Sequence, residues 1–448
     1  MGRLYGGGNN AMKIKIQLII DSEENTTCIE DVVNFQREGL SAATLGLTLQ
    51  EAKEITSNVQ HIMTHYQIKE FLKTEQPCPE CGKVRTIKGY CNIIYRTLFG
   101  KLTLKSPRLH QCECSRKEAK TWSPLAYLLS ERLPPEFSYL QSKWASLMSY
   151  GVTVNLLEEV LPLDTSVSSL FNNIQQVSSR LEGELGDEKV FFVNGCQRDW
   201  YNLPKPDLPI TVGIDGGYVH AREGDNRKAG WFEVIVGKSL QEEEKTKRFA
   251  FVTQYDKKPK RRLYDMLMKQ GLQMNQQITF LSDGGENVRE LQKYLSPQAE
   301  HILDWFHITM KLTVMNQMIK GLSSVNKEAI EKELERIKWY LWHGNLFKAL
   351  QTLENLSFET EAGLEEQDNK EINFWKAIDE FYDYINSNRN FIVNYGERYH
   401  HGEIIATGFV ESTVNELISK RMVKKQQMRW TKKGDHHLLQ FRVKTLNE

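Results

Sequence analysis

The 448-residue sequence lacks any uninterrupted apolar run near the ~20 residues that a membrane-spanning helix needs. Residues 1–11 are rich in glycine and polar side chains and lack the apolar centre of a signal peptide, so we expect the fold to begin near Met12. An excess of one charge is also missing, because 58 lysine and arginine residues balance 58 aspartate and glutamate residues. We therefore predict a cytoplasmic protein without a membrane partner, in which any binding of nucleic acid depends on local basic surfaces.

Cysteine is scarce, with seven residues in the chain, and four of the seven form two close pairs. The pairs are Cys78 with Cys81 and Cys112 with Cys114, and a Gly-centred hairpin pattern at 95–104 lies between them. Few and clustered cysteines favour a metal site over a disulfide framework. The spacing predicts a zinc ribbon with a structural Zn²⁺, and Cys91 is an alternative ligand.

Five β-rich apolar stretches follow one another in the second half of the chain. They are 210–220, 231–236, 248–253, 278–283 and 301–307. Each is bounded by polar or charged residues, and the first three follow closely enough to predict an antiparallel meander. The sequence therefore predicts a mixed α/β protein of several domains.

Two of these stretches carry an acid that two glycines follow. Asp215 lies in the first stretch and Asp283 ends the fourth. A single Asp-Gly pair is typical of a turn. Two of them at strand ends predict a shared site, because a buried acid needs a hydrogen bond, a charge partner or a metal ion.

The residues after the fifth stretch have a helical pattern as far as residue 387. His307 follows Asp304 by three residues, which places both side chains on one side of a helical turn. His307 is either part of the site that contains the two acids or a core histidine whose hydrogen bonds are satisfied.

Residues 134–180 also have a helical pattern, with a tight turn before the last helix. This arrangement predicts either a helix-turn-helix or a plain three-helix bundle. In a helix-turn-helix the last helix would offer Asn173, Gln176 and Arg180 to a DNA groove, where amide side chains suit base edges.

A late helical pattern at 408–422 carries Glu411 and leads into a basic segment. Such a segment is either a solvated face or a surface that binds phosphates. Its predicted nucleic-acid contacts are Lys420, Arg421, Lys424, Lys425, Arg429 and Trp430.

Three motifs in combination resemble the ISKra-type insertion-sequence transposases, distant relatives of the Mutator-like group. They are Asp283-Gly-Gly, Leu303-Asp-Trp-Phe-His-Ile308 and Val410-Glu-Ser followed by Lys-Arg-Met and Met428-Arg-Trp430. The resemblance covers nearly the whole chain. It implies a DDE transposase with a ribonuclease H-like catalytic domain that an all-helical insertion interrupts.

The resemblance also implies the chemistry and the partners. Asp215, Asp283 and Glu411 would hold two Mg²⁺ or Mn²⁺ ions, and His307 would help to orient the substrate phosphate. The partners would be double-stranded DNA, at the terminal inverted repeats and at the target, bound by a homodimer on paired ends. The location would be that of a bacterial, nucleoid-associated protein.

The predicted domain order follows from these segments. It is a strand and helix region at 12–75, a zinc-ribbon-like module at 76–116, a helical DNA-binding region at 117–185, a catalytic domain at 205–310 and 390–440, and a helical insertion at 311–389. Two functions remain open: an active transposase with endonuclease and strand-transfer chemistry, and a transposase-derived DNA-binding protein that no longer cuts. A structure-specific nuclease on the same fold is a third.

Overall fold

The computed structural model describes residues 12–21, 27–38, 41–114, 120–187, 203–222, 230–241, 246–295, 299–322, 326–362, 369–423 and 429–448. The chain forms two compact units, Met1–Ile174 and Gln175–Glu448, and both contain helices and strands. The prediction of a mixed α/β protein is therefore confirmed.

The first unit begins with an antiparallel hairpin and a long helix. These elements are β1 (Met12–Asp21), β2 (Thr27–Arg37) and α1 (Leu49–Glu75). The side chain of Thr48 accepts from the backbone of Glu51, and the Glu51 side chain accepts from the backbone of Thr48. This capping box fixes the start of α1.

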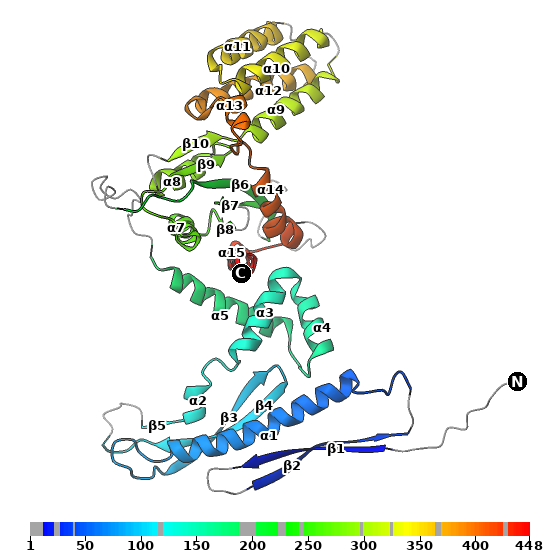
Figure 1. Ribbon diagram of the computed structural model, residues 1–448, viewed down its shortest axis with the longest axis vertical. Helices are drawn as coiled ribbons and strands as arrows, with labels where there is room; N and C mark the ends of the chain where they lie inside the picture. Colours follow the sequence, from blue (N-terminus) through cyan, green and yellow to red (C-terminus); the bar gives the residue numbers. More distant parts are fainter. Residues whose placement is uncertain are drawn as a thin grey trace, which may run out of the picture. The chain divides into compact units, whose positions relative to one another are not determined.

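A second antiparallel hairpin packs against α1, on the side opposite β1 and β2 (Figure 1). Its strands are β3 (Ile87–Thr97) and β4 (Gly100–His110), with the short β5 (Thr121–Trp122) at the end of β4. Buried and exposed residues alternate along β4, as expected for a strand with one solvated face. The buried face joins Ile93, Leu102 and Leu104 to α1 and to α2 (Pro124–Leu128).

Three further helices were expected between residues 134 and 180, and they are present. They are α3 (Pro135–Leu147), α4 (Tyr150–Val160) and α5 (Val167–Leu185). The division between the two units falls within α5. Residues 188–202, which lie between α5 and the second unit's sheet in the sequence, are outside the described residues.

A five-stranded sheet in the order β10-β9-β6-β7-β8 forms the centre of the second unit. Its strands are β6 (Ile210–His220), β7 (Trp231–Leu240), β8 (Thr246–Val252), β9 (Ile278–Ser282) and β10 (Glu300–Leu303). The first three form the predicted antiparallel meander, and β9 and β10 extend the sheet in parallel with β6. The fifth strand is shorter than predicted, because the Asp304 side chain caps a helix that starts at Trp305.

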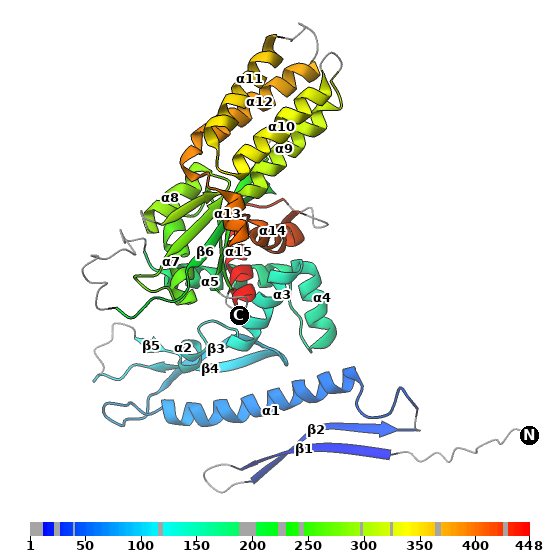
Figure 2. The ribbon, with the colours of Figure 1, turned by 45° about the horizontal axis from the view of Figure 1, so that its top comes forward.

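Helices cover both faces of this sheet (Figure 2). One face packs on α7 (Pro259–Gln270) and α8 (Glu286–Leu295) through Ile210, Val212 and Ile214. On the other face lie α14 (Gly408–Val414), the π-helical segment η2 (Asn415–Val423) and α15 (Lys432–Asn447).

A helical bundle separates β10 from α14 in the sequence, and its core continues into β9 and β10 through Leu281, Ile302 and Leu303. It comprises α9 (Trp305–Ile319), α10 (Lys327–Trp342), α11 (Leu346–Ala362) and α12 (Asn369–Ser387), followed by η1 (Arg389–Phe391) and α13 (Tyr395–His400). Apolar residues repeat at helical spacing, for example Ile330, Leu334, Ile337 and Leu341 on α10, and all four are buried.

Candidate functional site

The register of the parallel strands brings three acids to one level of the sheet. Gly213 pairs with Leu281, so Asp215 and Asp283 each lie two residues beyond a matched pair. Leu303 pairs with Ser282, so Asp304 lies level with Asp283 on the next strand. Neighbouring strands are about 4.8 Å apart, and residues at the same level point to the same face. The sheet therefore gathers acids from three segments that are far apart in sequence.

The acid on β6 lies on the sheet face that α14 and η2 cover. A Cβ added to Gly213 would meet Val410 at 2.2 Å, and one added to Gly217 would meet Ile418 at 2.8 Å. Asp215 lies between these two glycines, and side chains two apart along a strand share a face. Glycine at both positions thus permits the close approach of α14, the helix that carries Glu411. Glu411 itself is exposed.

Asp304 is fully buried and holds His307 in place. Its carboxylate accepts from His307 Nδ1 at 2.5 Å, from the backbone of Phe306 at 3.0 Å and from the backbone of Thr407 at 2.9 Å. The Thr407 hydroxyl donates to it as well. With its oxygens used in this way, Asp304 is a positioning residue that connects α9 to the start of α14.

The other ring nitrogen of His307 faces the acid on β6. His307 Nε2 lies 3.9 Å from Asp215 Oδ1. Burial lowers the pKa of His307, but the hydrogen bond with Asp304 and the charges of Asp304, Asp215 and Asp283 outweigh it and raise the pKa above 6.5. The structure thus places His307 beside Asp215.

The acids also affect one another. Burial raises the pKa of Asp215, with further increases from the charges of Asp283 and Asp304, against lowering by the Gly216 backbone and His307. Burial also acts to raise the pKa of Asp304, but hydrogen bonds from His307 and Thr407 outweigh it, so that pKa is lowered. The site therefore concentrates negative charge, which favours the protonated form of His307.

The loop after Asp283 is attached to the helical bundle. Gly284 has φ +84°, and a Cβ there would meet Asn388 Oδ1 at 2.2 Å, so glycine is needed on both counts. Arg289 donates to the Gly284 carbonyl at 2.8 Å and to Asn388 Oδ1 at 3.0 Å. The end of α12 thus fixes the loop that presents Asp283.

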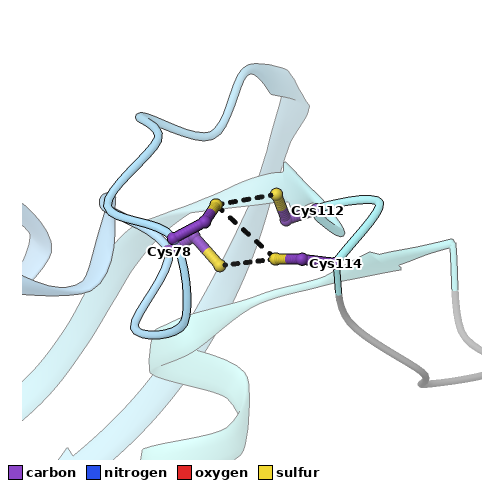
Figure 3. A group of neighbouring side chains, drawn as sticks. Cys78, Cys112 and Cys114 are labelled. Atoms are coloured by element: carbon purple, nitrogen blue, oxygen red, sulfur yellow. Dashed lines mark hydrogen bonds between the residues drawn. The ribbon is translucent and has the colours of Figure 1, made fainter.

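The four predicted cysteine ligands come together in the first unit (Figure 3). Cys78 Sγ lies 3.4 Å from Cys114 Sγ, and Cys81 Sγ lies 3.4 Å from Cys112 Sγ. These distances are near the roughly 3.8 Å edge of a tetrahedron with Zn–S bonds of about 2.3 Å. Backbone N–H groups of Cys81 and Glu80 lower the pKa of Cys78 to about 6, which favours the thiolate that binds metal. The four cysteines could hold a zinc ion.

Cys91, the alternative ligand, lies elsewhere. It is on β3, where its Sγ is 3.6 Å from Ser123 Oγ, and it is not part of the cysteine group.

A second group of possible ligands, which the sequence did not reveal, contains Glu182, Asp256 and His436. Arg262 lies among them, 7% exposed, and donates at 2.5 Å to both Asp256 Oδ2 and Glu182 Oε2. Its Nη2 is also 3.0 Å from His436 Nε2. The guanidinium already supplies the positive charge that a metal ion would bring, so we interpret this group as a buried ion-pair network.

The predicted carboxylates do not lie as close together as the ligand atoms of these two groups. Within the described part of the chain, the four cysteines and the group around Arg262 are the sets whose ligand atoms all lie within 4.8 Å of one another. Asp215, Asp283 and Glu411 do not form such a set. Two ions about 4 Å apart, each about 2.1 Å from its ligands, allow outer carboxylates to be separated by roughly 8 Å, so a two-ion site does not need that closeness.

One predicted DNA contact on α5 is wrong. Asn173 is 5% exposed, donates to Gln141 Oε1 at 2.9 Å and accepts from Ser138 at 3.1 Å, so it holds α5 against α3. Gln176 and Arg180, three and seven residues further along α5, are exposed.

Two predicted contacts in the C-terminal segment are also wrong. Arg421 is fully buried, and its guanidinium lies over the Trp430 ring at 5.1 Å. Trp430 is 5% exposed and forms a β-bridge with Ala221. Both residues therefore stabilise the packing of η2. Lys420 and Arg429 are exposed, whereas Lys424 and Lys425 lie outside the described residues.

No protein-family model and no curated protein sequence matches this chain. Across the described residues, every helix is too short or too polar to cross a membrane.

Proposed function

We propose that the chain is a DDE transposase of the ISKra type, which binds the ends of its insertion sequence and cleaves and transfers DNA strands. The observation that carries the proposal is the matched level of Asp215 and Asp283 on adjacent parallel strands. His307 faces Asp215 at that same end of the sheet.

The fold supports the ribonuclease H-like part of the proposal. That fold has an antiparallel meander extended by parallel strands, and the order β10-β9-β6-β7-β8 has this form. The helices α9 to α12 stand where the resemblance expects an insertion, between the fifth strand and the helix with Glu411.

The donor set fits hard divalent cations. Asp215, Asp283 and Glu411 would hold two Mg²⁺ or Mn²⁺ ions, which supply an activated oxygen nucleophile and neutralise the scissile phosphate. Two observations favour this fit. Burial, together with the charges of Asp283 and Asp304, raises the pKa of Asp215, and α14 approaches the sheet face on which Asp215 lies.

The residues of the chain would then position the substrate. Asp304 fixes the His307 ring, so that Nε2 can donate a hydrogen bond to a phosphate oxygen beside Asp215. Thr407 shares Asp304 with His307, so the start of the Glu411 helix and the histidine depend on the same buried carboxylate.

The DNA partner would be contacted by exposed groups on α5 and in the C-terminal basic segment. Gln176 and Arg180 remain the candidates for recognition on α5, and Lys420 and Arg429 for contacts with phosphates. In this proposal the DNA partners are the terminal inverted repeats and the target DNA. A homodimer would bind the paired ends, and the protein would act in the bacterial nucleoid.

The test is nicking of a labelled element-end duplex with Mg²⁺ or Mn²⁺. Asp215→Asn, Asp283→Asn and Glu411→Gln should each lower cleavage by at least about a thousandfold and leave end binding intact, because ligand charge is lost while shape is kept. Glu416→Gln, on η2, is the matched control and should cleave as the wild type does.

Equal cleavage by wild type and Glu411→Gln would overturn the assignment of the third ligand. A wild type that binds ends but never nicks them with either ion would favour the alternative, a transposase-derived DNA-binding protein without cleavage activity.

A further inference from the structure

One arginine joins the loop that carries Asp283 to the helical bundle. Arg289, on α8, donates to the Gly284 carbonyl from Nε at 2.8 Å and from Nη2 at 2.5 Å. The same Nη2 donates to Asn388 Oδ1 at 3.0 Å, and Asn388, 3% exposed, directly follows α12. Because a guanidinium presents its donors in a rigid planar fork, two of them on one carbonyl fix the orientation of that peptide. Arg289 therefore sets the direction in which the chain leaves Asp283.

The residue before Asp283 is held as well. Ser282 Oγ lies 3.0 Å from His301 Nε2, on the neighbouring strand β10. The His301 ring packs on Phe391 of η1, with ring centres 4.3 Å apart, and the Arg289 guanidinium lies 5.4 Å from the centre of the same Phe391 ring. Phe391 thus connects the contacts on the two sides of Asp283.

Among the described residues, Arg289 forms no ion pair. Its acceptors are a backbone carbonyl and a side-chain amide oxygen, both neutral. Arg398, on α13, attaches to the sheet differently, through ion pairs with Glu300 of β10 and with Glu403. Glu300 lies four residues before Asp304, roughly 13 Å away along the strand. Arg398 therefore provides a matched comparison for Arg289, because its guanidinium contacts the sheet away from the acids.

The carboxylate of Asp283 depends on this loop for its own position. Asp283 Oδ1 accepts from the Gly285 backbone at 3.0 Å, and Gly284, between them in sequence, has φ +84°. A change in the Gly284 peptide would therefore move the carboxylate relative to Asp215 on the neighbouring strand. Removing a residue that holds a metal ligand in place lowers metal affinity by roughly ten- to hundredfold.

We propose that Arg289 and Asn388 are positioning residues for Asp283, through which the helical bundle regulates the affinity of Asp215 and Asp283 for a divalent cation. This inference rests on the proposed function and adds a regulatory part for the inserted bundle. Coupling between two sites is reciprocal. A cation at the two acids should therefore also stabilise the turn that contains Asn388 and Phe391.

The first measurement is Mn²⁺ binding by the full chain without DNA, followed through the electron paramagnetic resonance signal of the free ion. Arg289→Ala should weaken binding at the acids roughly tenfold, because the Gly284 peptide is released. Arg289→Lys keeps the charge but lacks the fork, so it should not restore the affinity, whereas added guanidinium should. Asn388→Ala acts through the same contact, so combining it with Arg289→Ala should weaken binding no further.

Arg398→Ala is the matched control. It should lower the free energy of unfolding and leave the Mn²⁺ affinity unchanged. The second measurement is hydrogen exchange at the amides of Asn388 and Phe391, which donate to backbone carbonyls at the end of α12. Mn²⁺ should slow this exchange in the wild type and in Arg398→Ala, but not in Arg289→Ala.

Mn²⁺ binding that is lost in Asp215→Asn but unchanged in Arg289→Ala would overturn the positioning role and leave the metal site in place. Equal weakening in Arg289→Ala and Arg398→Ala would also overturn it, because a general loosening of the bundle would then account for both. A wild type that binds no Mn²⁺ at these acids would overturn the metal site of the proposed function and this inference with it.

Discussion

The second unit contains two groups in which acids surround a histidine, and they differ in how the charge is balanced. Around Arg262, the guanidinium bonds with one oxygen of Glu182 and with Asp256, and His436 Nε2 lies 3.4 Å from the other oxygen of Glu182. At the ends of the parallel strands, the charge of His307 acts on Asp215 against the charges of Asp283 and Asp304. The first group is complete without a ligand, and the second retains an excess of negative charge. Distance alone would have selected the first group as the metal site, whereas charge balance selects the second.

The largest expected effect is a loss of stability when the ion-pair network around Arg262 is broken. Arg262→Met should lower the free energy of unfolding by about 3–5 kcal/mol, because Asp256 and Glu182 would be buried without a counter-charge. Urea denaturation measures it. Lys269→Met, which breaks the exposed pair with Asp265, is the control and should cost less than about 1 kcal/mol. Equal losses in the two variants would mean that the network is not a stabilising unit.

The next effect is a dependence of the free energy of unfolding on pH. Burial acts to raise the pKa of Glu182, but His436 and Arg262 outweigh it and lower the pKa to about 2. Its stabilisation is thus present above the unfolded value near 4.5 and is lost as pH falls toward 2. We expect Glu182→Gln to be less stable than wild type at pH 6 by up to about 3 kcal/mol, with the difference vanishing near pH 2. Denaturation of both proteins across this range tests the sign, and a difference that grows in acid would contradict it.

Metal addition should distinguish the two groups directly. Mg²⁺ at a hundred times its dissociation constant should stabilise the wild type by about 2.7 kcal/mol. Asp215→Asn should lose this increment. Asp256→Asn should keep it, although its own stability is lower. Thermal unfolding with and without Mg²⁺ gives both increments, and an increment lost only in Asp256→Asn would exchange the roles of the two groups.

The sequence contained enough to predict one of these groups and not the other. Asp215 and Asp283 stand at the ends of recognisable strands, and strand order follows from the pattern of the chain. The network around Arg262 joins α5, the loop after β8, α7 and α15, and no local pattern indicates that these segments meet.

Burial on helices was the harder part to predict. Residues 420–430 are rich in basic side chains, but the number of basic residues does not indicate which of them face inward. Arg421 lies in a π-helical segment, where the residues that share a face differ from those of an α-helix. Thr407 gave no signal at all, because its role depends on the buried Asp304.

The smallest expected effect separates the two groups in the absence of metal. The pKa of Asp215 is raised, mainly by burial, so the native protein binds more protons than the unfolded chain above pH 3.8. Stability from this group therefore falls as pH rises through the unfolded value toward the folded one. Asp215→Asn removes that loss, and it should raise the melting temperature of the metal-free protein at pH 7 by roughly a few degrees. Near pH 3 the two proteins should have the same melting temperature.

Glu331→Gln, at an exposed position on α10, is the control and should leave the melting temperature unchanged at both pH values. A variant less stable than wild type at pH 7 would mean that His307 already balances the carboxylates. The charges at the strand ends would then already be balanced, as in the Arg262 network, and the assignment of a metal ion to this group would be wrong.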